Sequence, residues 1–333
     1  MGGRRAGLVF GLAALVAASC SGGGGGKPAG TASAVRFGFW GDTPYSGDEA
    51  RALVDLVEQI NDADLDLAIF VGDIFGAPCD NTGYTAAVDL FNSLRGPVVY
   101  LPGDNEWTDC HPTRKDPLER LAHIRRTMFA TDRSFGRRPI TVEQQQPDYP
   151  ENGRWRMGPA LFVSLNVAGS NNNHIADPEA DEEGTPRGPD ERRAAEAEYL
   201  TRDKADRDWL HQSFEIAVRD ATPAVVVAIH ADPGFTIPAG ERVRRRVDGF
   251  DRFLAALADE AQAYAKPVLL LHGDSHRFVQ DQPLVDAAGQ TVANVTRIET
   301  YGSPDVGWVE VVLDPAGATP LRVEPRLVQG APR

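Results

Sequence analysis

Five short apolar segments of this chain end in side chains that bind protons or metal ions. Four of them end in Gly-Asp, namely VRFGFWGD, LAIFVGD, PVVYLPGD and VLLLHGD. The fifth, PAVVVAIH, ends in a histidine, and another histidine stands two positions after the last aspartate. Apolar runs of this length between longer, helix-compatible segments are typical of buried parallel strands. The side chains concerned are Asp42, Asp73, Asp104, His230, Asp274 and His276.

These six side chains are expected to converge. The carboxyl ends of parallel strands lie along one edge of a sheet, where open α/β folds bind their ligands. Four carboxylates in one place repel one another unless cations neutralise them. A pair of divalent metals about 3.5 to 4 Å apart, bridged by one carboxylate, can hold an attacking hydroxide and both oxygens of a phosphoryl displacement. Mixed carboxylate and imidazole ligands favour Mn, Fe or Zn over Ca.

Each motif taken alone has a simpler interpretation. An aspartate after glycine at a strand end is often a turn residue or the N-cap of the next helix. For a single Gly-Asp that interpretation is favoured, because short motifs match by chance. Four of them in order, followed by His230 and by Asp274 with His276, favour a shared site.

The elements that must position these side chains follow from periodicity. The segments 130–158 and 171–195 show no pattern that fixes a fold, and we expect these loops to shape the choice of substrate. The β-rich C-terminal end has a hairpin connection at PAGATP. The spacing predicts strands over 34–41, 66–71, 97–101, 160–169, 223–229 and 267–272, β-rich segments over 294–302, 307–314 and 321–328, and helices over 48–61, 85–95, 116–129, 190–219 and 248–264.

In order and position the motifs resemble those of the calcineurin-like metallophosphoesterases. That family's pattern is D-x-H, G-D, G-N-H-[DE], a lone His and G-H-x-H, and this chain has GDTPY, VGDIF, PGDNEW, AIH and HGDSH between about 34 and 310. The resemblance implies a four-layer α/β/β/α sandwich of two mixed sheets, and hydrolysis of a small phosphoester by a dinuclear metal centre with an activated hydroxide. It implies Asp73 as the bridging ligand, Asp42 and His276 on the first metal, and Asp104, His230 and Asp274 on the second.

The sequence departs from the family pattern at several positions. Pro44 stands where the first motif has a histidine ligand, so Tyr45 or water must replace it. Asp104 and Asp274 replace an Asn and a His, which keeps oxygen ligands and adds negative charge. Asn105 stands where the family's catalytic histidine protonates the leaving group, and an amide donates a hydrogen bond but cannot deliver a proton.

Because the family's catalytic histidine is replaced, the group that protonates the leaving group is left open. His111, six residues after Asn105, and His272, beside the last ligand pair, are candidate substitutes, although His272 ends an apolar strand and is equally expected to be packed. Glu106 is expected to orient whichever group acts. The rival hypothesis is a membrane-tethered metal- or phosphate-binding module that kept the fold but lost efficient turnover, for which Pro44 and Asn105 argue. A protein-interaction domain without metal is a third interpretation.

The N-terminal segment indicates export. Two arginines, a short apolar run and small residues before Cys20 are typical of a signal peptide, and VAASC resembles a bacterial lipobox. We expect residues 1–19 to be removed, lipid on Cys20 to attach the protein to the membrane, residues 20–33 to form a flexible tether and residues 34–333 to form the metallophosphoesterase-like domain. The location is then the outer face of the bacterial cell membrane. Ordinary secretion with cleavage elsewhere is the alternative.

Composition bounds the remaining choices. The 333 residues, 42% of them hydrophobic, suit one large domain or two small ones. A formal net charge of −14 argues against binding to nucleic acid. With Cys20 assigned to lipid, Cys79 and Cys110 are a possible disulfide pair in an oxidising compartment, and two free buried thiols are the alternative.

Overall fold

The computed structural model describes residues 34–76, 79–175 and 187–328. The chain divides into two units, Met1–Thr31 and Ala32–Arg333, and every described residue belongs to the second. The predicted signal peptide and the whole of the predicted tether, residues 1–33, lie outside the described residues. Among the residues that are described, no helix is long and apolar enough to cross a membrane.

The first of two mixed β-sheets has five strands in the order β12-β11-β1-β2-β3. Its three N-terminal strands run parallel, with Phe37 opposite Leu67 and Ala68 opposite Val98. The two C-terminal strands extend this sheet: β11 pairs antiparallel with β1, and β12 pairs antiparallel with β11. The strands are β1 (Val35–Trp40), β2 (Leu67–Phe70), β3 (Val98–Tyr100), β11 (Gly307–Leu313) and β12 (Leu321–Leu327).

The second sheet has seven strands in the order β4-β5-β6-β7-β8-β10-β9. Its centre is parallel from β6 to β10, and antiparallel strands close both edges. The strands are β4 (Glu143–Gln145), β5 (Tyr149–Met157), β6 (Ala160–Ser164), β7 (Ala224–Ala228), β8 (Val268–His272), β9 (Val279–Asp281) and β10 (Val295–Glu299).

Side-chain caps begin several of the helices. Ser46 accepts a hydrogen bond from the Glu49 N–H before α1, and Asp116, followed by Pro117, accepts one from the Leu118 N–H before α3. The main helices are α1 (Gly47–Asp62), α2 (Asn81–Ser93), α3 (Pro117–Thr127), α5 (Pro189–Arg219) and α6 (Asp251–Tyr264), with short turns at α4 (Gly169–Asn172), η1 (Thr108–Thr113), η2 (Ala239–Glu241) and η3 (Asp248–Phe250).

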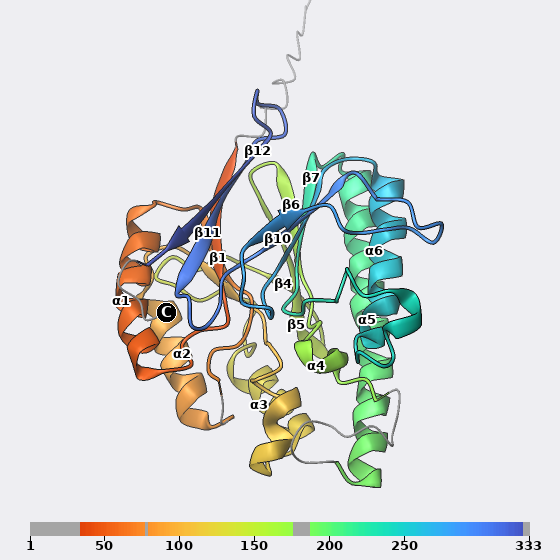
Figure 1. Ribbon diagram of the computed structural model, residues 1–333. Helices are drawn as coiled ribbons and strands as arrows, with labels where there is room; N and C mark the ends of the chain where they lie inside the picture. The colour runs from red at the N-terminus through yellow and green to blue at the C-terminus, as the bar shows by residue number, and fades with distance from the viewer. Residues whose placement is uncertain (1–33, 77–78, 176–186, 329–333) are drawn as a thin grey trace, which may run out of the picture. The chain divides into compact units, whose positions relative to one another are not determined.

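Three apolar layers separate four layers of structure. One lies between the five-stranded sheet and helices α1 and α2, where Trp40, Phe70 and Phe91 pack. The middle layer joins the two sheets, with Phe37 edge-on to Phe162 at 5.2 Å between ring centroids. The third lies under α5 and α6, on the opposite side in Figure 1. The described unit is therefore the four-layer α/β/β/α sandwich of two mixed sheets that the sequence predicts.

Three segments differ from the predictions. The strand predicted over 160–169 is shorter, since β6 ends at Ser164 and α4 begins at Gly169. Helix α2 runs over Asn81–Ser93 rather than 85–95, because the Asp80 side chain accepts from the Gly83 N–H and starts the helix one turn earlier. The stretch 130–158, expected to be loop, contains β4 and β5. Both strands contain polar residues that form hydrogen bonds with other elements of the chain. Their polar and apolar residues therefore do not alternate in the way that predicts a strand.

Candidate metal centre

Four of the predicted ligands follow strands in unusual backbone turns. Asp42 and Asp73, which come shortly after β1 and β2, have φ values of 54° and 63°, and Asp274 and His276, after β8, have φ values of 73° and 62°. Non-glycine residues adopt this left-handed conformation rarely, and such positions cluster at functional sites. Glycine leaves room for the carboxylates: a Cβ added at Gly103 would lie 2.1 Å from Asp73 Oδ1, and one at Gly273 2.2 Å from Asp42 Oδ2.

The turns bring the side chains into two overlapping groups. Asp42, Asp73 and His230 offer ligand atoms within 4.8 Å of one another, and so do Asp104, His230 and Asp274. The Nε2 atom of His230 lies 2.9 Å from Asp104 Oδ1, 3.5 Å from Asp73 Oδ1 and 3.8 Å from Asp274 Oδ1. His230 thus stands between the two groups, a double role that the spacing of motifs along the sequence did not indicate.

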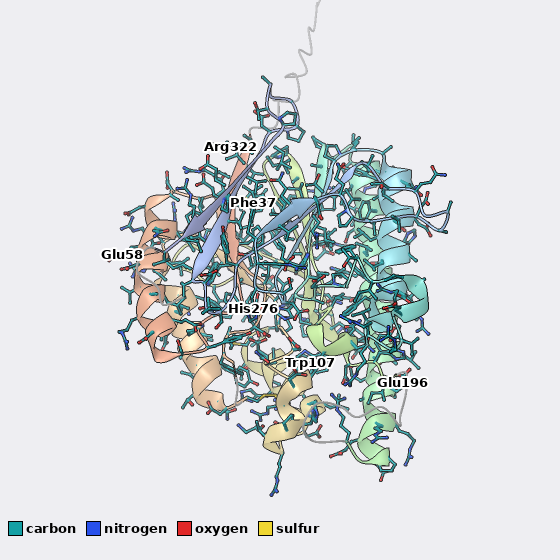
Figure 2. All side chains as sticks on the ribbon, viewed as in Figure 1. Phe37, Glu58, Trp107, Glu196, His276 and Arg322 are labelled. Carbon is teal, nitrogen blue, oxygen red and sulfur yellow. A yellow bond between two sulfur atoms is a disulfide. The ribbon has the colours of Figure 1, made fainter. Side chains whose placement is uncertain are left out.

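His276 approaches the site from the side of Asp42. Its Nε2 atom lies 3.6 Å from Asp42 Oδ1, as expected for two ligands of one metal. It is nevertheless His230 that completes the compact group with Asp42 and Asp73. Figure 2 shows His276 at the end of the sheets that lies opposite Arg322.

Both histidines are oriented by backbone carbonyls. The Nδ1 atom of His230 lies 2.7 Å from the Val71 carbonyl oxygen, and that of His276 lies 2.7 Å from the Ser303 carbonyl oxygen. A carbonyl only accepts, so each ring donates through Nδ1 and turns Nε2 toward the carboxylates. Metal-binding histidines are commonly held in this way, with the second ring nitrogen bonded to a carbonyl or carboxylate.

Burial makes the aspartate cluster electrostatically costly without a cation. It raises the pKa of Asp42 and Asp73 well above their usual range, and that of Asp274 to about 7. Burial acts on the pKa of Asp104 in the same direction, but hydrogen bonds from His230 and Ser170 lower it overall. The pKa of His230 is raised, because the neighbouring aspartates outweigh its own burial. A buried set of carboxylate oxygens and imidazole nitrogens with this charge fits divalent cations.

Asn105 and Tyr45 add neutral hydrogen-bond donors beside Asp73. The Asn105 backbone N–H donates to Asp73 Oδ1 at 3.1 Å, and its side-chain amide donates to the Tyr45 hydroxyl at 3.0 Å. Tyr45 donates in turn to Asp73 Oδ2 at 2.5 Å. Burial raises the pKa of Tyr45, so the phenol stays protonated at neutral pH. The residue named as a replacement for the ligand missing at Pro44 therefore contacts the expected bridging carboxylate.

Glu106 holds the loops that carry the ligands. Its carboxylate is fully buried and accepts from the backbone N–H groups of Asp73 at 3.1 Å, Gly103 at 2.6 Å and Ile74. These bonds fasten the turn after β2 to the turn after β3. Glu106 therefore fixes the backbone around Asp73 and Asp104, whereas the expectation that it orients the proton donor stays a prediction.

The two candidate acids occupy different surroundings. His111 lies on η1, with Nδ1 3.2 Å from the Thr108 carbonyl oxygen, and it lines a cavity together with Asn105. His272 is fully buried, and burial lowers its pKa to about 4. Its ring lies 6.3 Å from that of Phe235. The packing interpretation therefore applies to His272, and His111 is left as the candidate acid.

Ser170 is a site residue that the sequence reasoning missed. Its hydroxyl donates to Asp104 Oδ2 at 2.9 Å. It belongs to a left-handed turn, with φ of 48° at Ser170 and 57° to 62° over Asn171–Asn173. A left-handed turn has no reliable sequence signal outside glycine, so this contact could not be predicted from the sequence.

Cys79 and Cys110 form a disulfide, with their Cα atoms 5.7 Å apart. This confirms the predicted pairing over the alternative of two free thiols. The bond joins the loop after β2 to η1, so it ties together two segments beside the aspartate cluster. A disulfide here is consistent with an exported protein.

Comparison with known proteins gives a match in structure alone. No protein-family model matches the chain, and no curated protein matches its sequence. A dimetal phosphatase from Danio rerio superposes with a TM-score of 0.56 at 12% identity, covering 88% of this chain and 96% of that one. This chain has a dimetal phosphatase fold. GAP50, the anchor in the inner membrane complex of Plasmodium, is a more distant match, with a TM-score of 0.46, 9% identity and coverage of 89% of each chain.

Proposed function

We propose that this protein is a metal-dependent phosphoesterase with a dinuclear centre of Mn, Fe or Zn. The observation that carries the proposal is the pair of buried groups that share His230, on a dimetal phosphatase fold. Asp73 would bridge the metals, Asp42 and His276 would complete the first site, and Asp104, His230 and Asp274 the second. When bound, the metals would polarise the phosphoryl oxygens and lower the pKa of water.

The residues around the cluster have separate roles in this proposal. The Asn105 amide is a neutral donor that would hold a phosphoryl oxygen without repelling it, and the Tyr45 hydroxyl, which donates to Asp73 Oδ2, would keep that amide and the carboxylate in position. Glu106 fixes the backbone that carries Asp73 and Asp104. His111, which lines the cavity beside Asn105, is the proposed proton donor to the leaving group.

The alternative is a tethered metal- or phosphate-binding module with little or no turnover. Its support is Asn105, since an amide beside Asp73 binds phosphate but cannot transfer a proton. Metal retained without hydrolysis of either monoesters or diesters would favour this function. Restoration of activity by Asn105→His would then identify the lost step.

The deciding experiment uses residues 34–333, stripped of metal and reloaded with Mn, Fe or Zn. We expect hydrolysis of an aryl phosphomonoester or diester that depends on the metal, and its loss, together with a lower metal content, in Asp73→Asn. Asp89→Asn is the matched control, because Asp89 is exposed on α2. Equal metal content and equal hydrolysis in Asp73→Asn and Asp89→Asn would show the site assignment to be wrong.

We further propose that the protein is exported and anchored through lipid on Cys20. The short apolar run before VAASC supports this, and the Cys79–Cys110 disulfide is consistent with an oxidising compartment. The substrate would then be a small phosphoester that reaches the outer face of the membrane.

A further inference from the structure

A cavity of about 490 Å³ adjoins the metal centre. Two residues of its wall touch the candidate ligands: the Asn105 N–H donates to Asp73 Oδ1, and the Ser170 hydroxyl donates to Asp104 Oδ2. The volume lies within the range of small-molecule sites, about 300 to 1,000 Å³. A substrate whose phosphoryl group lies at the aspartate cluster would therefore place the rest of its structure here.

Side chains of both charge signs line this cavity. Two arginines, Arg187 and Arg246, line it together with His111 and His174. Asp109 is the one acidic side chain among the described lining residues. Two carboxylates lie behind His174, since its ring nitrogens are 2.7 Å from Glu196 and 3.3 Å from Asp248. Among the described lining residues the two arginines are thus the fixed positive charges, and Asp109 is the opposing negative charge.

Arg187 is held in position inside the wall. Only 7% of the residue is exposed. One guanidinium nitrogen, Nη1, donates to Asn173 Oδ1 at 2.6 Å, and the other, Nη2, donates to the Thr108 carbonyl oxygen at 3.2 Å. A planar guanidinium fixed in this way matches the geometry of a carboxylate or phosphate and loses little freedom on binding one.

The turn that supports Arg187 is itself fixed from behind. The fully buried Arg202 donates to the carbonyl oxygen and to the side-chain oxygen of Asn172, at 2.8 and 2.7 Å. The Gly249 N–H donates to Asn171 Oδ1 at 2.8 Å. These bonds hold the left-handed turn and therefore the positions of Ser170 and Asn173. This part of the wall is consequently formed before any ligand binds.

We propose that this cavity selects phosphoesters that carry a second anionic group, a carboxylate or a further phosphate. Arg187 binds that group from within the wall and exposed Arg246 attracts it at the rim, while the phosphoryl group lies at the aspartate cluster. The inference rests on the proposed function for the position of the phosphoryl group. It assigns the specificity of the site to residues outside the metal ligands.

Four esters of one shape test the proposal: phenyl phosphate, 4-carbamoylphenyl phosphate, 4-carboxyphenyl phosphate and 1,4-phenylene bisphosphate. We expect kcat/KM to be about 10- to 100-fold higher for a charged ester than for the neutral carbamoyl ester, the range of one hydrogen bond to a charged group. A preference for the carboxylate or for the bisphosphate identifies which anion the wall binds. Arg187→Gln and Arg246→Gln should each reduce that preference. Arg322→Gln, at the opposite end of the sheets in Figure 2, should retain it.

A measurement of binding tests the same preference without depending on turnover. Calorimetry with the non-hydrolysable phenylphosphonate and 4-carboxyphenylphosphonate should show the same preference and the same loss in Arg187→Gln. Equal binding of both phosphonates, with equal kcat/KM for charged and neutral esters, would overturn the proposal. If Arg187→Gln does not fold, exposed Arg246→Gln decides, and an unchanged preference in that variant refutes the inference. Absence of hydrolysis with every ester contradicts the proposed function instead, and the phosphonates still test the cavity.

Discussion

The buried aspartate cluster predicts that the metal-free protein loses stability as the pH rises. Asp274 shows the size of the effect, because burial and the charge of Asp104 raise its pKa from 3.8 to about 7. Between these values the folded state binds more protons than the unfolded state, so the free energy of unfolding falls with increasing pH. The rise corresponds to about 4 kcal/mol for this one group, at 1.36 kcal/mol for each pH unit. That stability is present below pH 3.8 and is lost as the pH passes 7.

Urea unfolding of chelator-treated protein at pH 5, 6, 7 and 8 measures this dependence. Asp274→Asn isolates it, because the amide does not titrate, and the wild type should lose about 3 kcal/mol relative to this variant between pH 5 and pH 8. Adding Mn²⁺ or Zn²⁺ at pH 7 to 8 should restore stability in the wild type, by about 4 kcal/mol at 1,000 times the dissociation constant. A difference between wild type and Asp274→Asn that does not change with pH would refute the electrostatic reasoning.

Three further outcomes follow from the same contacts. In Glu106→Gln the side-chain NH2 group faces a buried backbone N–H that it cannot accept, so the free energy of unfolding measured in urea should fall by about 2 to 5 kcal/mol. The exposed control Glu58→Gln should change it by less than about 0.5 kcal/mol. Replacing Cys79 and Cys110 together by serine opens a loop with a sequence separation of 31 and should cost about 3 to 4 kcal/mol, measured by urea unfolding, an effect that reduction of the wild type should reproduce. Cys20→Ser should abolish lipid attachment and move the protein from the detergent phase to the aqueous phase in Triton X-114 partitioning, whereas unchanged partitioning would contradict the proposed anchor.

The strands that carry the ligands could be predicted because their own sequences determine them. Apolar runs such as Leu67–Phe70 and Val268–His272 are buried on both faces of a sheet, so each is almost continuous in hydrophobicity and ends at the site. Strand β5 could not be predicted in this way. Its residues Glu151 and Asn152 are buried, and they are tolerated because Arg125 and Asp206, distant in the sequence, provide their hydrogen-bonding partners.

Part of the site could likewise be predicted from the sequence, and part depends on tertiary structure. The convergence of the aspartates followed from strand ends alone, since parallel strands bring those ends to one edge. The central position of His230 depends on which strand lies beside which, and the Ser170 contact depends on a left-handed turn that Arg202 holds from another helix. Such contacts are fixed by tertiary structure, so a linear pattern indicates which residues lie near the site but not which atoms meet.

The charge of the centre connects the two proposals. Asp104 and Asp274 stand where the resembled family has neutral ligands, so four ionised aspartates would balance the charge of two divalent cations. A centre that is neutral overall attracts a phosphoester less strongly than a cationic one. Side chains beyond the ligands must then supply the attraction, and Arg187 and Arg246 lie on the adjoining wall.

Replacing Asp104 by asparagine should therefore weaken the dependence of substrate binding on Arg187, since the centre itself would regain positive charge. An effect of Arg187→Gln on KM that is the same in both backgrounds would show that the two regions act independently.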